Sequence, residues 1–181
     1  MEISALTRSV VKRNHAVIAT DGYINSNVPG WTGCTVNVII NEAMGANLCQ
    51  TLITLTKDGK LIGSTKESQI FFYIVKGKAK ATVGGTKKVL SKGQFVYVPI
   101  KKGYKFEDIE EGTQILTFHK VYEKLAGYAV PGVLFGDAAK VDGPSYLGDD
   151  ALRLQVLLPD NLSFDMAVNI FTYESGGHLP M

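Results

Sequence analysis

Hydrophobic and polar residues alternate along most of the chain, and a period of two residues indicates β-strands. Residues 34–40 alternate, residues 48–56 are rich in β-branched side chains, and residues 70–75 have the continuous apolar pattern of a central strand. Residues 94–99 and 113–122 follow the same rules. Glycine-containing turns separate these runs, and no segment shows a long helical stripe. The pattern therefore predicts an all-β protein.

The spacing of the strands also predicts how the chain is divided. Many short strands at close intervals indicate a sandwich or barrel of antiparallel sheets, which hides its strand edges. We expect an N-terminal arm over residues 1–31, a barrel over residues 32–122 and, where Gly, Pro, Asp and Ala accumulate, a linker over residues 123–150. Residues 151–181 hold two further strand-like runs, over residues 152–159 and 164–173. Two strands are too few for a domain, so they pair with the barrel, pair with a second subunit, or begin a domain absent from this chain.

Composition limits the class of protein. Hydrophobic residues make up 45% and charged residues 20% of the sequence, which is typical of a globular domain with a real core. The formal net charge of +2 gives no global electrostatic case for binding nucleic acid or an anionic membrane. We find neither an apolar run of the ~20 residues that a membrane span needs nor a signal-peptide pattern. Cys34 and Cys49 lie in strand-like segments and are expected to be buried free thiols, which suits a cytoplasmic location.

Two local patterns specify the barrel further. Residues 69–84 form a strand, a turn at Gly77 and a return strand. Residues 90–106 contain a turn at Gly93, a strand that ends at Pro99, and a second glycine turn. Together they resemble the paired motifs of cupins. We therefore expect a cupin double-stranded β-helix, a jelly-roll barrel, with a C-terminal strand extension.

The metal site common in cupins is missing from these motifs. In metal-binding cupins the first motif carries two histidines and a glutamate and the second carries another histidine, which together hold a divalent ion. Here Gln69 stands where the glutamate is expected, and Lys105 lies near the position of the second-motif histidine, where its ammonium would repel a cation. Glu67 is a lone carboxylate, and such residues usually lie at the surface. We expect no metal ligand and no catalytic residue in this chain.

Other candidate catalytic or ligand-binding residues are scattered along the chain. Three histidines are spread along the chain without a nucleophile or a phosphate-binding loop beside them: His15, His119 and His178. Lysines are dense over residues 76–105, where they form either a solvated face that guards a sheet edge or an anion-binding patch. Acidic residues follow directly at 107–111 and favour the solvated face.

A series of stretches in the same order, covering essentially the whole chain, resembles the N-terminal part of the (S)-ureidoglycine aminohydrolases. These bicupins of allantoin degradation were formerly called glyoxylate-induced proteins. No single stretch is specific to the family, but the occurrence of all of them in the same order is. The matching stretches are residues 11–20, 28–34, 72–77, 93–99, 120–128, 157–159, 164–166 and 176–178.

The resemblance implies a two-barrel protein whose first barrel is structural and usually free of metal. The second barrel would hold manganese through a Glu-x-His-x3-His segment and a later glutamine, and would release ammonia from ureidoglycine to give ureidoglycolate. That segment would begin just after Met181, so residues 151–181 would be the first strands of an incomplete second cupin. We therefore expect a truncated or shortened relative that is inactive alone and has no cofactor of its own.

Two alternatives remain at the level of the sequence. The chain could be a non-catalytic cupin that binds a partner subunit or a small anionic or ureide ligand at a barrel mouth lined by Tyr73, Tyr97 and Lys105. It could also be a metal enzyme of the isomerase or dioxygenase type, although the missing histidines argue against this. The apolar residues within 152–173 need a cover, so we expect a homodimer joined through these strands, for example by strand exchange.

Overall fold

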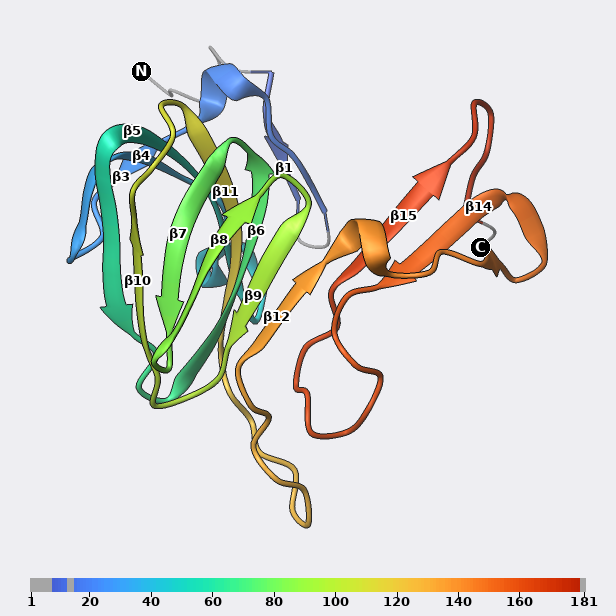
Figure 1. Cartoon of the computed structure of the whole chain (residues 1–181). Coiled ribbons are helices and arrows are strands. Elements are labelled where there is room, and N and C mark those ends of the chain that lie inside the picture. Colours follow the sequence, from blue (N-terminus) through green and yellow to red (C-terminus); the bar gives the residue numbers. More distant parts are fainter. Residues whose placement is uncertain (1–7, 13–14, 180–181) are drawn as a thin grey trace.

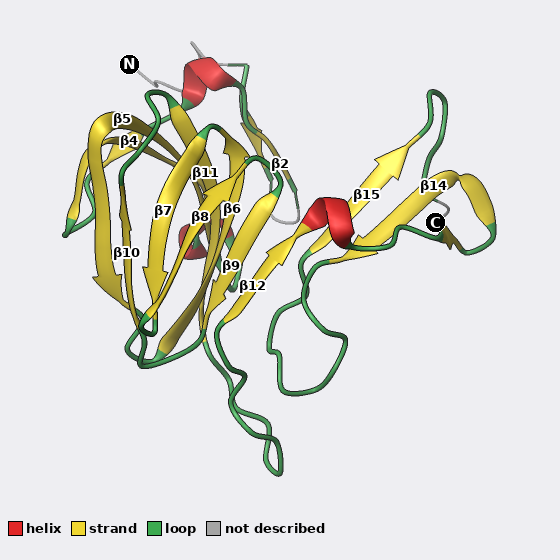
Figure 2. Ribbon diagram, in the orientation of Figure 1, coloured by secondary structure: helices red, strands yellow, loops and turns green. Residues whose placement is uncertain are grey.

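The computed structural model describes residues 8–12 and 15–179 of the 181-residue chain, and β-strands dominate it (Figures 1 and 2). The helices in this part are three short 3-10 turns: η2 (Thr20–Gly22), η3 (Glu42–Met44) and η4 (Ala138–Lys140). The strands are β1 (Val10–Val11), β2 (Ala16–Val17), β3 (Asn25–Ser26), β4 (Trp31–Ile40), β5 (Cys49–Ser64), β6 (Ser68–Lys76), β7 (Lys78–Val83), β8 (Thr86–Ser91), β9 (Gln94–Val98), β10 (Gly103–Glu107), β11 (Thr113–Val121), β12 (Leu134–Asp137), β13 (Ser145–Tyr146), β14 (Asp149–Val156) and β15 (Asn169–Tyr173). No helix in the described part of the chain is long and apolar enough to cross a membrane.

One ten-stranded antiparallel sheet curls around to form the barrel (Figure 1). Its strands follow the order β12-β9-β6-β11-β5-β10-β7-β8, while β4 and β3 continue from the other edge of β5. Strand β5 is 16 residues long, so its first half pairs with β11 and its last four residues pair with β10. This sharing of one strand joins the two faces of the barrel. The expected all-β cupin barrel is confirmed.

Alternation along each strand separates two apolar clusters. On β6, Ile70, Phe72 and Ile74 point into the barrel, whereas Phe71 and Tyr73 belong to the cluster on the outer face of the sheet. The interior cluster is closely packed and apolar. Its buried members are Val36, Ile53, Leu55, Leu61, Ile70, Phe72, Ile74, Ala79, Ala81, Val83, Leu90, Val96, Val98, Phe106, Ile109 and Ile115.

The C-terminal part forms a separate three-stranded sheet of order β13-β14-β15, which lies beside the barrel (Figure 1). In the described part of the chain these strands pair only with one another, so the alternative in which they pair with the barrel is wrong. Residues 157–168, between β14 and β15, form a segment that we call the strap. Leu157, Leu158 and Phe164 of the strap pack against Phe71 and Tyr97 on the outer face of the barrel sheet.

The structure adds strands to the barrel on both sides of the expected range. Strand β3 lies in the expected arm and pairs with β4. Strand β12 lies in the expected linker and pairs with β9. Gly136 makes the second pairing possible, because a Cβ there would collide with the ring of Phe95. The strand expected from Phe164 begins only at Asn169, since residues 164–168 belong to the strap.

Candidate functional site

The barrel interior is where a cupin would hold a metal, and here hydrocarbon fills it. On β6 the interior positions are Ile70 and Phe72, whereas Gln69 points to the outer face. The expectation that Gln69 stands at the metal-facing glutamate position is therefore wrong. The reason is strand alternation, because a shift of one residue moves a side chain to the opposite face of the sheet.

The polar side chains inside the barrel include Thr51 of β5 and Thr117 of β11, both buried. Their hydroxyl oxygens lie 2.6 Å apart and share a hydrogen bond. Manganese prefers carboxylate and imidazole ligands, and threonine hydroxyls that are bonded to each other are poor substitutes. In residues 8–12 and 15–179 there is no group of three or more His, Cys, Asp or Glu side chains placed to hold an ion. The donors present in the described barrel do not fit the metal.

The three residues proposed for a ligand site do not meet at a barrel mouth. Tyr73 and Tyr97 lie on the outer face of the β6–β9 sheet, on the side that the strap covers. Lys105 lies on the outer face of β10, where its ammonium is 2.6 Å from the carboxylate of Glu107. Its neighbour Phe106 points inward, with its ring 4.7 Å from that of Phe72. The phase of each strand therefore excludes the shared mouth.

Under the strap, one carboxylate oxygen collects three donors. Oδ2 of Asp165 accepts hydrogen bonds from Nζ of Lys120 at 2.6 Å, Nε2 of Gln69 at 3.1 Å and the backbone N–H of Glu123 at 2.8 Å. The Lys120 and Asp165 side chains are only 13% and 18% exposed. Such charge-assisted bonds are short and directional. We call Gln69, Tyr97, Lys120 and Asp165 the anchor.

The fourth member of the anchor sets the orientation of the Gln69 amide. The hydroxyl of Tyr97 donates to Oε1 of Gln69 over 3.0 Å, and both side chains are fully buried. Burial, together with the nearby hydroxyl of Tyr122 and the carboxylate of Asp165, raises the pKa of Tyr97, so its hydroxyl stays protonated and acts as a donor. The amide nitrogen of Gln69 is then free to donate to Asp165.

A hollow of about 500 Å³ lies beside the anchor, between the barrel sheet and the strap. Phe71, Tyr73 and Phe118 form part of its barrel wall, and Met166 and Ile170 part of the opposite wall. Its lining is mainly apolar, and its volume lies within the range of small-molecule sites.

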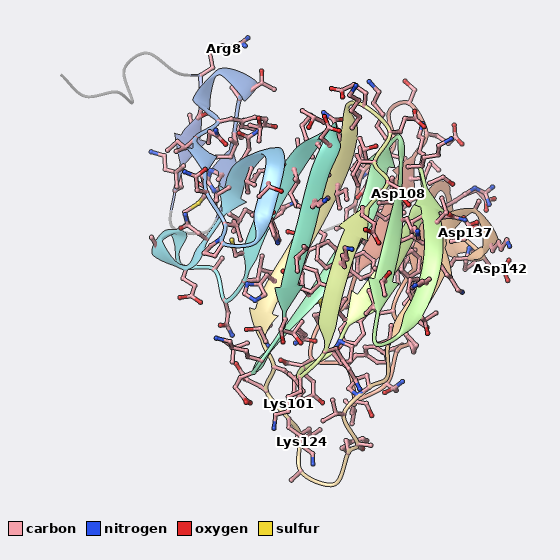
Figure 3. The ribbon with its side chains drawn as sticks, turned by 60° about the vertical axis from the view of Figure 1, so that its left-hand side comes forward. Arg8, Lys101, Asp108, Lys124, Asp137 and Asp142 are labelled. Carbon is pink, nitrogen blue, oxygen red and sulfur yellow. The ribbon has the colours of Figure 1, made fainter. Side chains whose placement is uncertain are left out.

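The lysine-rich face has the character of a solvated outer surface. Nζ of Lys80 lies 3.0 Å from Asp108, and Nζ of Lys78 lies 3.6 Å from Glu110. These exposed pairs neutralise part of the charge and favour the interpretation as a solvated face that guards a sheet edge. Figure 3 shows Lys101 and Lys124 at the end of the molecule opposite Arg8.

The cysteines are free thiols, as expected, although both are half-buried rather than buried. Burial raises the pKa of Cys34 and Cys49, and the carboxylate of Glu42 adds to the effect at Cys49. His119 lies directly across from Cys49 in the β11–β5 pairing. These groups provide neither an activated thiolate nor a catalytic dyad.

Comparisons with known proteins identify relatives along the whole length of the chain. The curated (S)-ureidoglycine aminohydrolase of Escherichia coli (strain K12) is 30% identical over 173 residues, a match that covers 93% of this chain and 66% of the relative. The chain is related by sequence to the (S)-ureidoglycine aminohydrolases. The probable (S)-ureidoglycine aminohydrolase of Oryza sativa is 24% identical over 179 residues, covering 98% of this chain and 57% of its own length. The chain thus spans less than two thirds of these two members of the family.

Solved structures agree on the fold of the chain. The crystal structure of the YlbA protein from E. coli matches with a TM-score of 0.79 at 24% identity, covering 92% of this chain and 68% of that one. A putative glyoxylate-induced protein from Pseudomonas aeruginosa matches with a TM-score of 0.75 at 18% identity, with coverages of 83% and 58%. No protein-family model matches the chain. The family resemblance inferred from the sequence is confirmed.

Sequence reasoning missed the anchor. Asp165 stands alone among apolar residues in the run from Phe164 to Val168, and Lys120 interrupts the outward-facing apolar side of β11. A single charge inside an apolar pattern is the signal that could have found each of them, because buried charges need partners. Their pairing, across 45 residues of sequence, could only come from the fold.

Proposed function

We propose that this chain acts as the non-catalytic barrel of an (S)-ureidoglycine aminohydrolase. The manganese-binding barrel, where ureidoglycine and water give ureidoglycolate and ammonia, then lies outside these 181 residues. The observation that carries the proposal is the apolar interior of the described barrel, with Ile70 and Phe72 at interior positions of β6. The kinship to curated aminohydrolases supplies the reaction. The chain alone is inactive, and its setting is allantoin degradation in the cytoplasm.

The chemistry of the reaction also favours a non-catalytic role for this barrel. Replacement of an amino group by water needs a nucleophilic water and a group that takes up its proton. The interior hydroxyls of Thr51 and Thr117 are weak bases and are bonded to each other. The barrel therefore contributes stability and shape, and presents the C-terminal sheet to the rest of the assembly.

We further propose that the C-terminal sheet is an assembly surface, through which two copies of the chain form a dimer. Val156, Phe171 and Tyr173 are 40%, 37% and 43% exposed, which is high for large apolar side chains on two neighbouring strands. Strand β15 is also an edge strand, and exposed apolar edges favour pairing with another chain.

Ammonia release from ureidoglycine tests the proposed role. The 181-residue chain is incubated with ureidoglycine and Mn²⁺, beside a protein-free blank and the full-length E. coli relative as a positive control. We expect ammonia from the chain at the rate of the blank only. Release above the blank, in proportion to the concentration of the chain, would contradict the proposal.

A second candidate function is a cupin that binds a small ligand without catalysis, and the hollow of about 500 Å³ is the observation in its favour. Ligands with carboxylate or ureide groups are the class to try in a thermal-shift assay. A rise in melting temperature that saturates with ligand concentration would support this function, and no shift across the series would exclude it for these ligands.

A further inference from the structure

We propose that Gln69 and Asp165 are positioning residues: they fix the strap in one register on the barrel. Together with the bonds that Nε2 of Gln155 donates to the carbonyls of Ala138 and Val141, each 2.7 Å long, they set the orientation of the C-terminal sheet. Only the consequence for catalysis rests on the proposed function, namely that this sheet leads toward the metal-binding barrel. The anchor itself is a property of the chain in hand.

The anchor fixes the strap at one point from three sides. Gln69 comes from β6, Lys120 from β11, and the N–H of Glu123 from the chain just after β11, and all three donate to the same oxygen of Asp165. Lys120 also donates to the backbone carbonyl of Asp165 at 3.3 Å. Three donors from different directions define the position of a carboxylate far better than one can.

No β-pairing fixes the position of the strap on the barrel in place of the anchor. The strands of the C-terminal sheet pair only with one another in the described part of the chain. The other contacts of the strap with the barrel are mostly apolar, such as the rings of Phe164 and Tyr97, whose centroids lie 5.2 Å apart. Apolar contact is non-directional and permits sliding. A hydrogen bond from the hydroxyl of Tyr122 to the carbonyl of Ser163, at 2.9 Å, adds a second directional contact beside the anchor.

An amide is the side chain that the Gln69 position requires. Its oxygen accepts from Tyr97 while its nitrogen donates to Asp165, so one group satisfies a buried donor and a buried acceptor at once. A carboxylate at this position would face Asp165 with a like charge, and a hydrocarbon would leave both partners short of a bond. The charged and titratable groups around the position are Lys120, Asp165, Tyr97 and Tyr122, with Glu123 3.8 Å from Lys120.

Hydrogen exchange of the 181-residue chain tests the anchor with a matched pair of variants. Asp165→Asn removes the charge that the donors share, whereas Asp160→Asn makes the same change at an exposed position of the same strap. We expect amides of residues 157–168 to exchange about tenfold faster or more in D165N, the effect of losing a charge-assisted hydrogen bond. The amides of β6 and β11 should keep their protection. Equal exchange of the strap in D165N, D160N and the wild type would overturn the proposal.

Gln69→Glu adds a readout that simple packing would not give. At pH 7 the introduced carboxylate should repel Asp165 and loosen the strap. Protonation of the introduced group at lower pH removes the repulsion and lets that group donate to Asp165, so strap protection relative to the wild type at the same pH should return. Loss of protection that is independent of pH would contradict the proposed positioning role.

The two proposals can fail separately. Exchange in the strap is measured without substrate or metal. Ammonia release by the chain would therefore contradict the proposed function without affecting the proposed role of the anchor. Unchanged exchange in the variants would remove the anchor and leave the proposed function untouched.

Discussion

The hydroxyl of Tyr97 is buried beneath the strap, and Oε1 of Gln69 is its acceptor. Tyr97→Phe keeps the ring but leaves that oxygen unpaired. We expect the free energy of unfolding to fall by about 1–3 kcal/mol, the cost of a buried polar group without its partner. Urea denaturation followed by fluorescence measures the change.

Tyr73→Phe is the matched control, because Tyr73 lies on the same face and its hydroxyl has no hydrogen bond within the described residues. Its loss should cost less than about 0.5 kcal/mol. Equal losses in the two variants would show that the bond to Gln69 contributes nothing.

The same residues show what the sequence can and cannot give at this scale. The absence of His-x-His and the apolar character of residues 70–75 are visible in the sequence, and the apolar interior agrees with them. The face on which Gln69, Tyr73, Tyr97 and Lys105 lie was not predictable, because it depends on the phase of each strand. When a strand is apolar on both faces, as β6 is, the sequence does not show which of its residues point into the barrel.

At the scale of elements, β12 joins the barrel through a close approach of its backbone to Phe95. Gly136 sits over that ring, and a methyl group there would overlap it. Gly136→Ala should therefore lower the free energy of unfolding by about 1–3 kcal/mol, the usual cost of overpacking. Thermal or urea unfolding measures the difference.

Gly132→Ala is the control, since a Cβ at position 132 meets no atom within 4 Å. We expect a change within about 0.5 kcal/mol for this variant. If G136A is as stable as G132A, then β12 is not held against Phe95 as described.

Elements with a clear period were predictable, and those that depend on tertiary contact were not. Strands β6, β9 and β11 match strand-like runs of the sequence. Strand β5 begins in such a run but continues beyond its predicted end at residue 56, through a predicted turn, to Ser64. Strand β12 has only four residues within a segment rich in Gly, Pro and Asp, where local composition favours loops. The strap has an apolar pattern that resembles a strand, but its side chains pack onto a sheet that is already complete.

At the scale of the whole molecule, the barrel and the C-terminal sheet differ in how much apolar surface they leave exposed. The barrel encloses its own core, whereas the C-terminal sheet leaves Phe171 and Tyr173 partly exposed on an edge strand. We expect the chain to elute at twice its monomer mass in size-exclusion chromatography with light scattering. Phe171→Lys should shift the population toward monomers, because a charge on an apolar interface opposes association.

Thr86→Lys, on the exposed start of β8, is the matched control and should leave the dimer intact. A wild-type chain that is monomeric at micromolar concentration, in light scattering and in solution X-ray scattering, would refute assembly through the C-terminal sheet.

The barrel with an apolar interior is the central claim about the whole molecule. The most direct test is the manganese content of the purified 181-residue chain, measured by mass spectrometry after incubation with Mn²⁺ and removal of free metal. The described interior is mainly hydrocarbon and threonine hydroxyls, and the described residues hold no group of three or more His, Cys, Asp or Glu side chains that could bind an ion, so we expect manganese well below one ion per chain. A stable content of one manganese per chain would contradict the account.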